Sequence, residues 1–403
     1  MQYTEYELGE LLPFEQPTAY IVKSTDYCDA YATPVLTAGK SFILGKTNET
    51  DGIFDQLPVI IFDDFTTATQ FVNFRFKVKS SAMKILHINT DLVIPKYIFY
   101  RLQIIQFDHS THKRYWIQSY SKIKVLIPPL DEQFRIVARI EELFSELDKA
   151  VDTLKTTKEQ LEVYRQAILQ QAFIGNSNYH KRKSSIPKAE FKPVDAKELV
   201  QLASLPQEWK YVYLSDLGNL SRGKSSHRPR NDPKLFENGV YPFFQTGDVK
   251  GAQKDLYNCE KKYNDVGLAQ SKLWPAGTLC ITIAANIAET CFLGVDGCFP
   301  DSIVGFIPND NLVLKEYIRF FIEASKLKLW AYAPATAQKN INLSTLENLI
   351  VPYCGIEEQQ YIVQKIEEID SVCNKLEQTI DIALAQADAM RQSILKQSFE
   401  EKI

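Results

Sequence analysis

The sequence predicts an α+β protein in which two mainly β domains with small helices are joined by two long helices, packed as an antiparallel coiled coil. Three observations carry this prediction: a heptad pattern over residues 131–173, its return 226 positions later, and a looser return of the segment that precedes each helix. Two copies of a domain-helix unit in one chain can pack about a pseudo-twofold axis, as a homodimer otherwise would. We therefore expect a pseudo-twofold internal repeat.

The first long helix is predicted by apolar residues that recur every seven positions and by the absence of Gly and Pro. Period and propensity agree on one helix that must bury a seam against another helix. The pattern consists of two interleaved rows, each with a spacing of seven residues. The second row, which begins at Ile136, weakens at Ala150 and Thr157. The seam positions predicted in this helix are Ile136, Ile140, Leu143, Leu147, Leu154, Leu161 and Ile168.

The partner helix lies in the same chain, because adding 226 to each number returns the pattern without a gap. Identities return with it: Ile136-Val137 matches Ile362-Val363, and Arg165–Leu169 matches Arg391–Leu395 at four of five positions. A proline precedes each helix, which suits a helix start. The seam positions predicted in the second helix are Ile362, Ile366, Ile369, Leu376, Ile380 and Ile394.

The remaining chain alternates short apolar runs with turn residues, which is typical of strands. We expect strands at 20–22, 34–36, 41–44, 58–62 and 71–78, and in the second half at 211–214, 278–283 and 303–307; a short helix is expected to begin at Pro95. The predicted organisation is a domain at 1–128, a long helix at 129–175, a linker at 176–204, a second domain at 205–352 and a second long helix at 353–403.

Composition restricts the functional classes. The chain has 403 residues, 45% of them hydrophobic and 24% charged, which indicates a folded protein with real cores. Seven cysteines form no CxxC pair, so we expect free thiols and no metal site. The acidic, polar N-terminal stretch and the lack of a long apolar run predict no signal peptide, no membrane partner and a cytoplasmic location.

Charge is distributed unevenly along the chain. The net charge is −4, yet both long helices are acidic and the rest of the chain is mildly basic. Acidic helices suit contacts with protein, and basic domains permit a polyanionic partner. This offset is small and permits a nucleic-acid partner without establishing one.

Two short motifs suggest enzymes but lack the required context. Residues 218–225 fit the pattern GxxxxGK[ST], whereas a phosphate-binding loop also needs a following helix, and Pro229, Pro233 and Gly239 argue against one. Pro128-Pro129 resembles part of an adenine methyltransferase loop, but the flanking Ile127 and Leu130 cannot hold an amino group. We therefore expect no catalytic residues and no cofactor in this chain.

The repeated segments carry a family resemblance over essentially the whole chain. The carrying segments are 127–133 and 351–359 at the helix starts, 165–173 and 391–399 at the helix ends, 205–210 before a strand, and 338–343 before the second helix. Together they resemble the specificity subunit of type I restriction-modification systems. The first domain departs most, because it lacks the Leu-Pro-x-x-Trp opening found at 205–209.

The resemblance implies a non-catalytic reader of double-stranded DNA. Each domain would be a target-recognition domain for one half of an asymmetric, bipartite site, and the helices would act as a spacer. Two methyltransferase subunits would dock on the helices, and the presence of a restriction or translocase subunit is left open. S-adenosylmethionine, ATP and magnesium would belong to those partner subunits.

Candidate reading residues follow from DNA chemistry, because Lys and Arg bind phosphates while Arg, Lys, Asn, Gln and aromatic groups contact bases. The densest basic stretch, 221–230, lies on a loop with Gly and Pro, and 112–116 combines basic and aromatic residues; a solvated surface loop is the alternative for each. The candidates are Lys46, Thr69, Gln70, Lys113, Arg114, Tyr115, Arg222, Lys224, Arg228, Arg230, Lys250, Lys254, Lys339 and Asn340.

Other interpretations remain open from the sequence. One is a specificity subunit of a related methyltransferase-nuclease system without a separate translocating nuclease. Another is a coiled-coil DNA-binding regulator, which would bind a promoter alone and lead to no methylation. Dependence on a methyltransferase partner separates the first class from the second.

Overall fold

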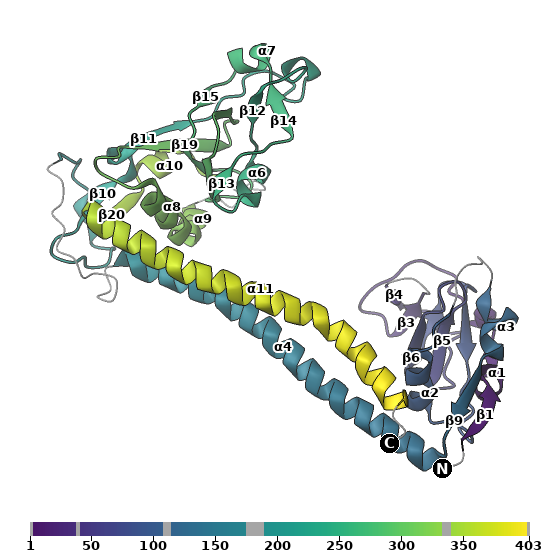
Figure 1. Cartoon of the computed structure of the whole chain (residues 1–403). Coiled ribbons are helices and arrows are strands. Elements are labelled where there is room, and N and C mark those ends of the chain that lie inside the picture. Colours follow the sequence, from purple (N-terminus) through teal and green to yellow (C-terminus); the bar gives the residue numbers. More distant parts are fainter. Residues whose placement is uncertain (1–2, 38–40, 108–113, 175–188, 333–339, 401–403) are drawn as a thin grey trace. The chain divides into compact units, whose positions relative to one another are not determined.

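The computed structural model describes residues 3–37, 41–107, 114–174, 189–332 and 340–400 (Figure 1). The chain forms two compact units, and each takes part of both long helices. The first contains residues 1–156 and 380–403, and the second contains residues 157–379. We call the globular part of the first unit lobe 1 (residues 3–128) and that of the second lobe 2 (residues 189–354).

Lobe 1 consists of two small sheets and a ribbon. A four-stranded antiparallel sheet has the order β2-β8-β5-β6, and a three-stranded sheet has the order β4-β3-β7, with β3 and β7 parallel. The ribbon pairs β1 with β9. The strands are β1 (Thr4–Glu7), β2 (Phe14–Glu15), β3 (Thr33–Leu36), β4 (Ile43–Thr47), β5 (Val59–Asp63), β6 (Thr69–Val72), β7 (Lys77–Val78), β8 (Met83–Leu86) and β9 (Lys124–Ile127).

The central strand β5 is buried on both faces, so lobe 1 has a core on each side of its sheet. Ile60 and Phe62 pack with α2, α3 and the start of the first long helix, whereas Val59 and Ile61 pack under the three-stranded sheet. Trp116 lies 4.9 Å from Phe62, ring to ring. The helices of lobe 1 are α1 (Leu8–Leu11), α2 (Pro95–Leu102) and α3 (Tyr115–Gln118), with 3-10 turns η1 (Pro17–Tyr20) and η2 (Tyr120–Lys122).

Lobe 2 repeats this architecture with additions. Its larger sheet has the order β11-β19-β16-β17-β13, its smaller sheet β14-β12-β18-β15, and its ribbon pairs β10 with β20. The strands are β10 (Lys210–Tyr213), β11 (Gly218–Arg222), β12 (Tyr241–Phe243), β13 (Asp255–Leu256), β14 (Lys261–Tyr263), β15 (Leu273–Trp274), β16 (Leu279–Thr282), β17 (Thr290–Leu293), β18 (Gly297–Cys298), β19 (Ile303–Pro308) and β20 (Ile350–Tyr353). The helices and turns are α5 (Ala196–Leu199), η3 (Leu214–Asp216), η4 (Pro233–Leu235), α6 (Thr246–Gly251), α7 (Asp265–Ala269), α8 (Lys315–Ala324), α9 (Lys326–Tyr332) and α10 (Leu343–Glu347).

The two lobes share one strand order. The order β2-β8-β5-β6 corresponds to β11-β19-β16-β17, and β4-β3-β7 corresponds to β14-β12-β18, including the one parallel pair. Lobe 2 adds β13 and β15 at the edges. The two lobes therefore have a common sheet framework on which the loops differ.

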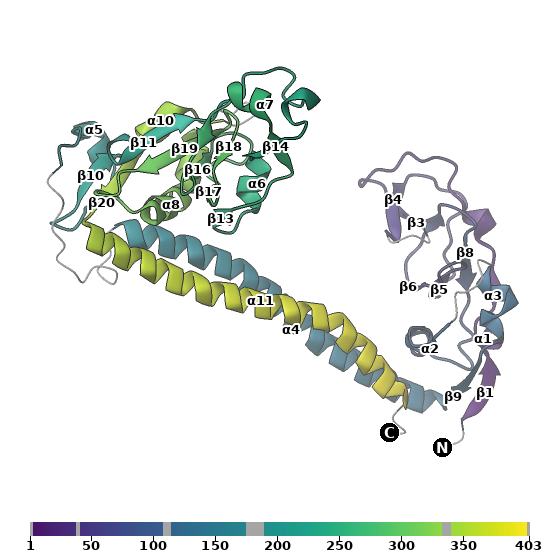
Figure 2. The same ribbon diagram turned by 45° about the horizontal axis from the view of Figure 1, so that its top comes forward.

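The long helices are α4 (Leu130–Ile174) and α11 (Ile356–Glu400), each of 45 residues. Within each unit they run antiparallel and touch, as Figure 2 shows for the yellow and blue helices. In the first unit Arg391 pairs with Asp148, and in the second Arg165 donates to Asn374 at 2.7 Å. The offset of 226 converts each pair into the other, so the antiparallel contact is itself repeated.

One predicted row of the seam is wrong in the middle of the helices. Leu376 is 49% exposed, and its equivalent Ala150 is also exposed. The reason is geometric, because a helix of 3.6 residues per turn drifts about 20° per heptad from a strict 3.5 repeat. The contact row moves one residue on, to Phe144, Val151, Lys158 and Arg165 in α4 and to Asp370, Glu377, Leu384 and Arg391 in α11, all partly buried.

The other predicted seam positions lie inward. Those that are buried are Ile136, Ile140, Ile168, Ile362, Ile366 and Ile380, and those that are partly buried are Leu143, Leu147, Leu154, Leu161, Ile369 and Ile394. Ile136 and Ile140 belong to the core of lobe 1, and Ile362 and Ile366 belong to the core of lobe 2. These four side chains are therefore not available to another protein.

Each helix end packs on a lobe through an equivalent aromatic pair. Phe173, at the end of α4, meets Tyr317 of α8 at 5.0 Å between ring centres. Phe399, at the end of α11, meets Tyr97 of α2 at 5.3 Å. In both views α8 lies between the sheet of lobe 2 and the long helices (Figures 1 and 2).

Most expected strands and the helix from Pro95 are present, with two exceptions. Residues 17–20 form a 3-10 turn and Ile21 makes only an isolated bridge, so the strand at 20–22 is wrong. The strand at 71–78 is broken into β6 and β7. Of the expected linker, residues 176–188 lie outside the described residues, and Phe191 packs against lobe 2. The exact domain boundaries stay a prediction.

Candidate nucleic-acid interface

The basic stretch of lobe 2 forms a loop that begins where β11 ends. Its backbone is held against the start of β19 and the segment before it: Gly223 N donates to Ile303 O at 2.9 Å, and Lys224 N donates to Phe299 O at 3.0 Å. A Cβ at Gly223 would clash with the backbone oxygens of Phe299 and Pro300. Glycine is therefore required for this close approach of two backbones.

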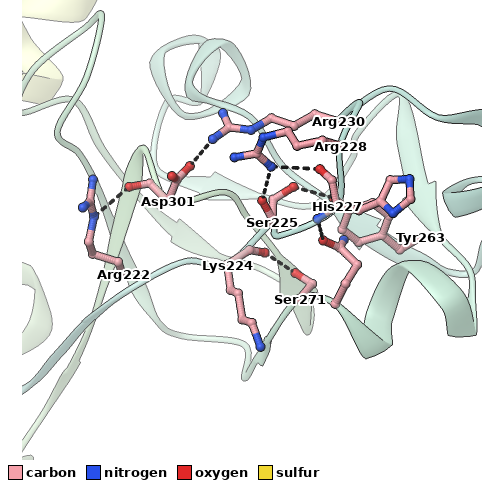
Figure 3. A network of polar contacts seen from close by, with 10 residues as sticks. Arg222, Lys224, Ser225, His227, Arg228, Arg230, Tyr263, Ser271 and Asp301 are labelled. Carbon is pink, nitrogen blue, oxygen red and sulfur yellow. Dashed lines mark hydrogen bonds and ion pairs between the residues drawn. The ribbon is translucent and has the colours of Figure 1, made fainter.

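The other side of the loop is held by residues 263–271. Ser271 Oγ donates to Lys224 O at 2.7 Å, and His227 N donates to Gln270 Oε1 at 2.9 Å (Figure 3). The hydroxyl groups of Ser225 and Tyr263 lie 3.3 Å apart in the interior. These contacts fix the backbone of the loop, so its side chains start from defined positions.

The arginines of this loop are oriented by contacts within lobe 2. Arg230 pairs with the Asp301 carboxylate at 2.8 Å, and Arg222 Nε donates to Asp301 O at 3.0 Å. Arg228 donates to the carbonyls of Ser225 and His227. Since the Arg230–Asp301 pair is about half exposed, it contributes little stability, and a phosphate can replace the carboxylate.

Lys224 differs from these arginines. Figure 3 shows its side chain pointing away from the network, and no described residue pairs with its ammonium group. Sequence reasoning missed a second lysine nearby. Lys272 donates to Ser221 Oγ at 2.9 Å and lies 3.7 Å from the centre of the Trp274 ring. Its only sequence signal is a basic residue two positions before a tryptophan.

Other predicted positions of lobe 2 are not gathered on this loop. Lys250 is exposed on α6. Asn340 is also exposed, and its backbone pairs with Ala284 in an isolated antiparallel β-bridge. Lys254 forms an ion pair with Glu367 of α11 at 3.0 Å, so it contacts the long helix. Lys339 lies outside the described residues.

The predicted positions of lobe 1 lie on separate elements. Lys46 is on β4, Thr69 accepts a hydrogen bond from Gln103 at 2.6 Å, Gln70 is exposed on β6, and Arg114 is exposed before α3. Lys113 lies outside the described residues. Tyr115 is wrong as a DNA-contact candidate: its side chain is 3% exposed, with its ring packed 5.0 Å from that of Phe107.

The fold gives residues 218–225 no phosphate-binding geometry. β11 occupies the first five residues of the motif, and the backbone amides of Gly223 and Lys224 are used by backbone carbonyls. The next described element is the three-residue turn η4, so no α-helix begins at the motif. A nucleotide site would need both features.

Among the described residues, no group of three His, Cys, Asp or Glu side chains is placed to hold a metal ion. Across the same residues, no helix combines the length and the apolar character needed to cross a membrane.

Comparison with known proteins places these features in a family. Residues 206–386 match the family described as the type I restriction modification DNA specificity domain. The specificity subunit of the type I restriction enzyme EcoR124I/EcoR124II from Escherichia coli is 31% identical over 381 residues, covering 92% of this chain and 87% of that protein.

Two solved structures share the fold. The HsdS subunit from Thermoanaerobacter tengcongensis aligns with a TM-score of 0.57 and 17% identity, over 100% of this chain and 97% of that one. A chain from a type I R-M system, solved to explain its complex assembly and conformational transition, aligns with a TM-score of 0.64 and 17% identity, over 98% and 97%. They confirm the α+β fold class predicted from the sequence.

Proposed function

This chain belongs to the family of type I restriction-modification DNA specificity subunits, and from that premise we propose how its lobes and helices divide the work. It recognises DNA within a type I restriction-modification complex and is not an enzyme on its own. We propose that each lobe reads one half of an asymmetric bipartite target. The long helices then set the number of unread base pairs between the halves.

The observation that carries this proposal is one sheet framework with different loops. Lobe 2 has the anchored basic loop at 222–230, whereas the exposed polar candidates of lobe 1 lie on β6 and before α3. Because base choice depends on the side chains that reach base edges, unlike loops imply unlike half-sites. A 45-residue helix spans roughly 70 Å at ~1.5 Å per residue. That length exceeds one DNA turn of about 34–36 Å.

Specificity subunits of this family assemble with other subunits of a type I complex and bind DNA. In this chain we propose two methyltransferase subunits as partners, docked on exposed positions of the long helices. The repeated helix framework supports two equivalent docking places. A restriction subunit would join as a third component, and the complex would act in the cytoplasm.

The cofactors of the reaction would belong to those partners. S-adenosylmethionine would serve the methyltransferase subunits, and ATP with magnesium would serve a restriction subunit. This chain's own hydrogen bonds support that assignment, because the backbone amides of Gly223 and Lys224 in its P-loop-like motif already donate to backbone carbonyls.

The test is methylation that depends on both this chain and a methyltransferase partner. The chain is co-expressed with its modification subunit, and methylated adenines are mapped in the genome with and without this chain. We expect one bipartite motif to be methylated only when both are present. A coiled-coil regulator would instead occupy a promoter alone and give no methylation, which would refute the proposal.

Exchange of lobe 1 provides a second test. Replacing residues 1–128 with the corresponding lobe of another specificity subunit should change one half of the methylated motif and leave the other half intact. A change in both halves would contradict reading by separate lobes.

A further inference from the structure

Lobe 1 contains a buried ion pair at the end of its central strand. Asp64 Oδ2 lies 3.3 Å from Lys84 Nζ, and both side chains are at most 2% exposed. Lys84 is on β8, and Asp64 directly follows β5. Taking two charges out of water is costly, and two apolar side chains would often be at least as stable. The pair therefore calls for a role other than stability.

Asp64 ties the segment after Arg114 to the sheet. Its Oδ1 accepts a hydrogen bond from Trp116 N at 2.8 Å, and its carbonyl accepts one from Tyr115 N at 3.0 Å. Tyr115 and Trp116 are the first two residues of the short helix α3, and Arg114 stands at its cap position. Within the described chain, the Arg114 side chain makes no capping bond and is exposed.

In α3 the residue at the cap position does not itself supply the capping oxygen. A capping residue is normally Ser, Thr, Asp or Asn, whose side-chain oxygen accepts from the second or third helical amide. Here the strand-end carboxylate of Asp64 supplies that oxygen to the second amide, Trp116 N. The cap position can then hold an arginine that points to solvent.

In lobe 2 the equivalent strand end carries no charged side chain, and the helix that follows is capped by its own residue. The strand pairing aligns Phe62 and Lys84 with Ile281 and Val304, which makes Ile283 the counterpart of Asp64. Ile283 O still accepts a backbone bond, from Ile341 N at 2.9 Å. The following helix α10 is capped by its own Asn342, whose Oδ1 accepts from Thr345 N at 2.8 Å.

We propose that Asp64, neutralised by Lys84, is a positioning residue that holds Arg114 as a DNA contact of lobe 1. This inference rests on the proposed function and deepens it. Lobe 1 carries few exposed basic residues near β5, β6 and α3 in its described part, so one fixed arginine matters there. The group recognised is a phosphate or a guanine edge of the first half-site, both of which match a guanidinium.

The experiment uses the full chain in complex with a methyltransferase subunit and S-adenosylmethionine. Methylation is measured on duplexes with point changes in either half-site, so that recognition by each lobe is scored separately. Thermal unfolding of every variant is recorded. The second half-site is the internal control.

The key comparison is between two double variants. D64I/K84V installs the apolar residues of lobe 2 and removes the acceptor for Trp116 N. We expect a folded protein whose methylation rate falls roughly tenfold or more when the first half-site limits binding, as for one lost base contact. D64N/K84M removes both charges and keeps an oxygen acceptor, so it should restore recognition. Arg114→Ser supplies its own cap and lacks the guanidinium, so it should lose first-half recognition without loss of stability.

The outcomes separate the two proposals. Unchanged recognition of the first half-site by Arg114→Ser, or by a folded D64I/K84V protein, would overturn the positioning role. An equal loss at both half-sites would overturn it as well, because the effect would be general. Absence of all methylation by the wild-type complex would instead refute the proposed function.

Discussion

Gln133 and Gln359 make the same three hydrogen bonds at the starts of the two long helices. Each is the fourth residue of its helix and is fully buried. Gln133 Oε1 accepts from Ile94 N at 2.8 Å, and its Nε2 donates to Leu92 O at 3.0 Å and Pro128 O at 2.9 Å. The partners of Gln359 are Leu314 N at 2.9 Å, Leu312 O at 3.1 Å and Cys354 O at 2.8 Å.

Replacing either glutamine with leucine should destabilise its unit. Gln133→Leu removes the side-chain partner of the buried Pro128 carbonyl and of two part-buried groups, the Ile94 amide and the Leu92 carbonyl. A buried group left unsatisfied costs about 1–3 kcal/mol. We expect a loss of at least about 2 kcal/mol in the free energy of unfolding, measured by urea denaturation. Gln160→Leu, an exposed change on α4, is the control and should stay within about 0.5 kcal/mol. Equal stability of the two variants would show that the hydrogen bonds do not matter.

Local patterns in the sequence predicted the elements best. The heptads identified α4 and α11, because a seam along 45 residues repeats its signal many times. The same strict period misplaced Leu376, because real helices drift from it. Period alone therefore predicts which helices pair, and not every residue in the pairing.

Individual site residues depended on contacts far away in the chain. Lys254 pairs with Glu367, and Tyr115 N donates to Asp64 O, and neither contact follows from neighbouring residues. The buried Asp64–Lys84 pair escaped notice for the same reason, since charged residues in a sequence read as surface. The anchored loop around Lys224 was predicted because four basic residues and a glycine lie within nine positions.

The thiols of lobe 2 should be protected from alkylation in the folded protein. Burial raises the pKa of Cys280, with a further contribution from the neighbouring Cys291, and burial also raises the pKa of Cys354. A raised pKa means less thiolate, which is the form that reacts. With iodoacetamide at neutral pH, mass spectrometry should find label on exposed Cys28 and none on Cys280 or Cys354 until denaturant is added. Rapid labelling of Cys280 in the native chain would contradict the burial of β16.

Lys224 should contribute to affinity more than to base choice. Its ammonium group is a point charge that points away from the loop network, which suits a phosphate. Lys224→Ala should weaken binding of the assembled complex to specific and non-specific DNA alike. It should also lower the slope of log K against log salt by about 1. Lys197→Ala on α5 is the matched control, and an equal slope change for both would remove Lys224 from the interface.

The role of the helices as a spacer can be tested by removing one heptad from each. Residues 140–146 and 366–372 are the pair at the starts of the repeats, but Ile140, Phe144 and Ile366 pack against the lobes. Residues 154–160 and 380–386 are a better choice, because they are related by 226 and leave Arg165, Arg391 and their partners in place. Seven residues shorten a helix by ~10 Å, or about three base pairs.

The deletion should therefore leave both half-sites unchanged and shorten the unread spacer. Removing about three base pairs also rotates one half-site around the DNA axis, so loss of assembly is the other outcome that fits a spacer role. Genome-wide mapping of methylated adenines measures the spacer directly. A deletion in α4 alone is the control, since it shifts the heptads of one helix against the other and should destabilise the pair. If the double deletion methylated the original motif with its original spacing, the helices would not determine the distance between half-sites.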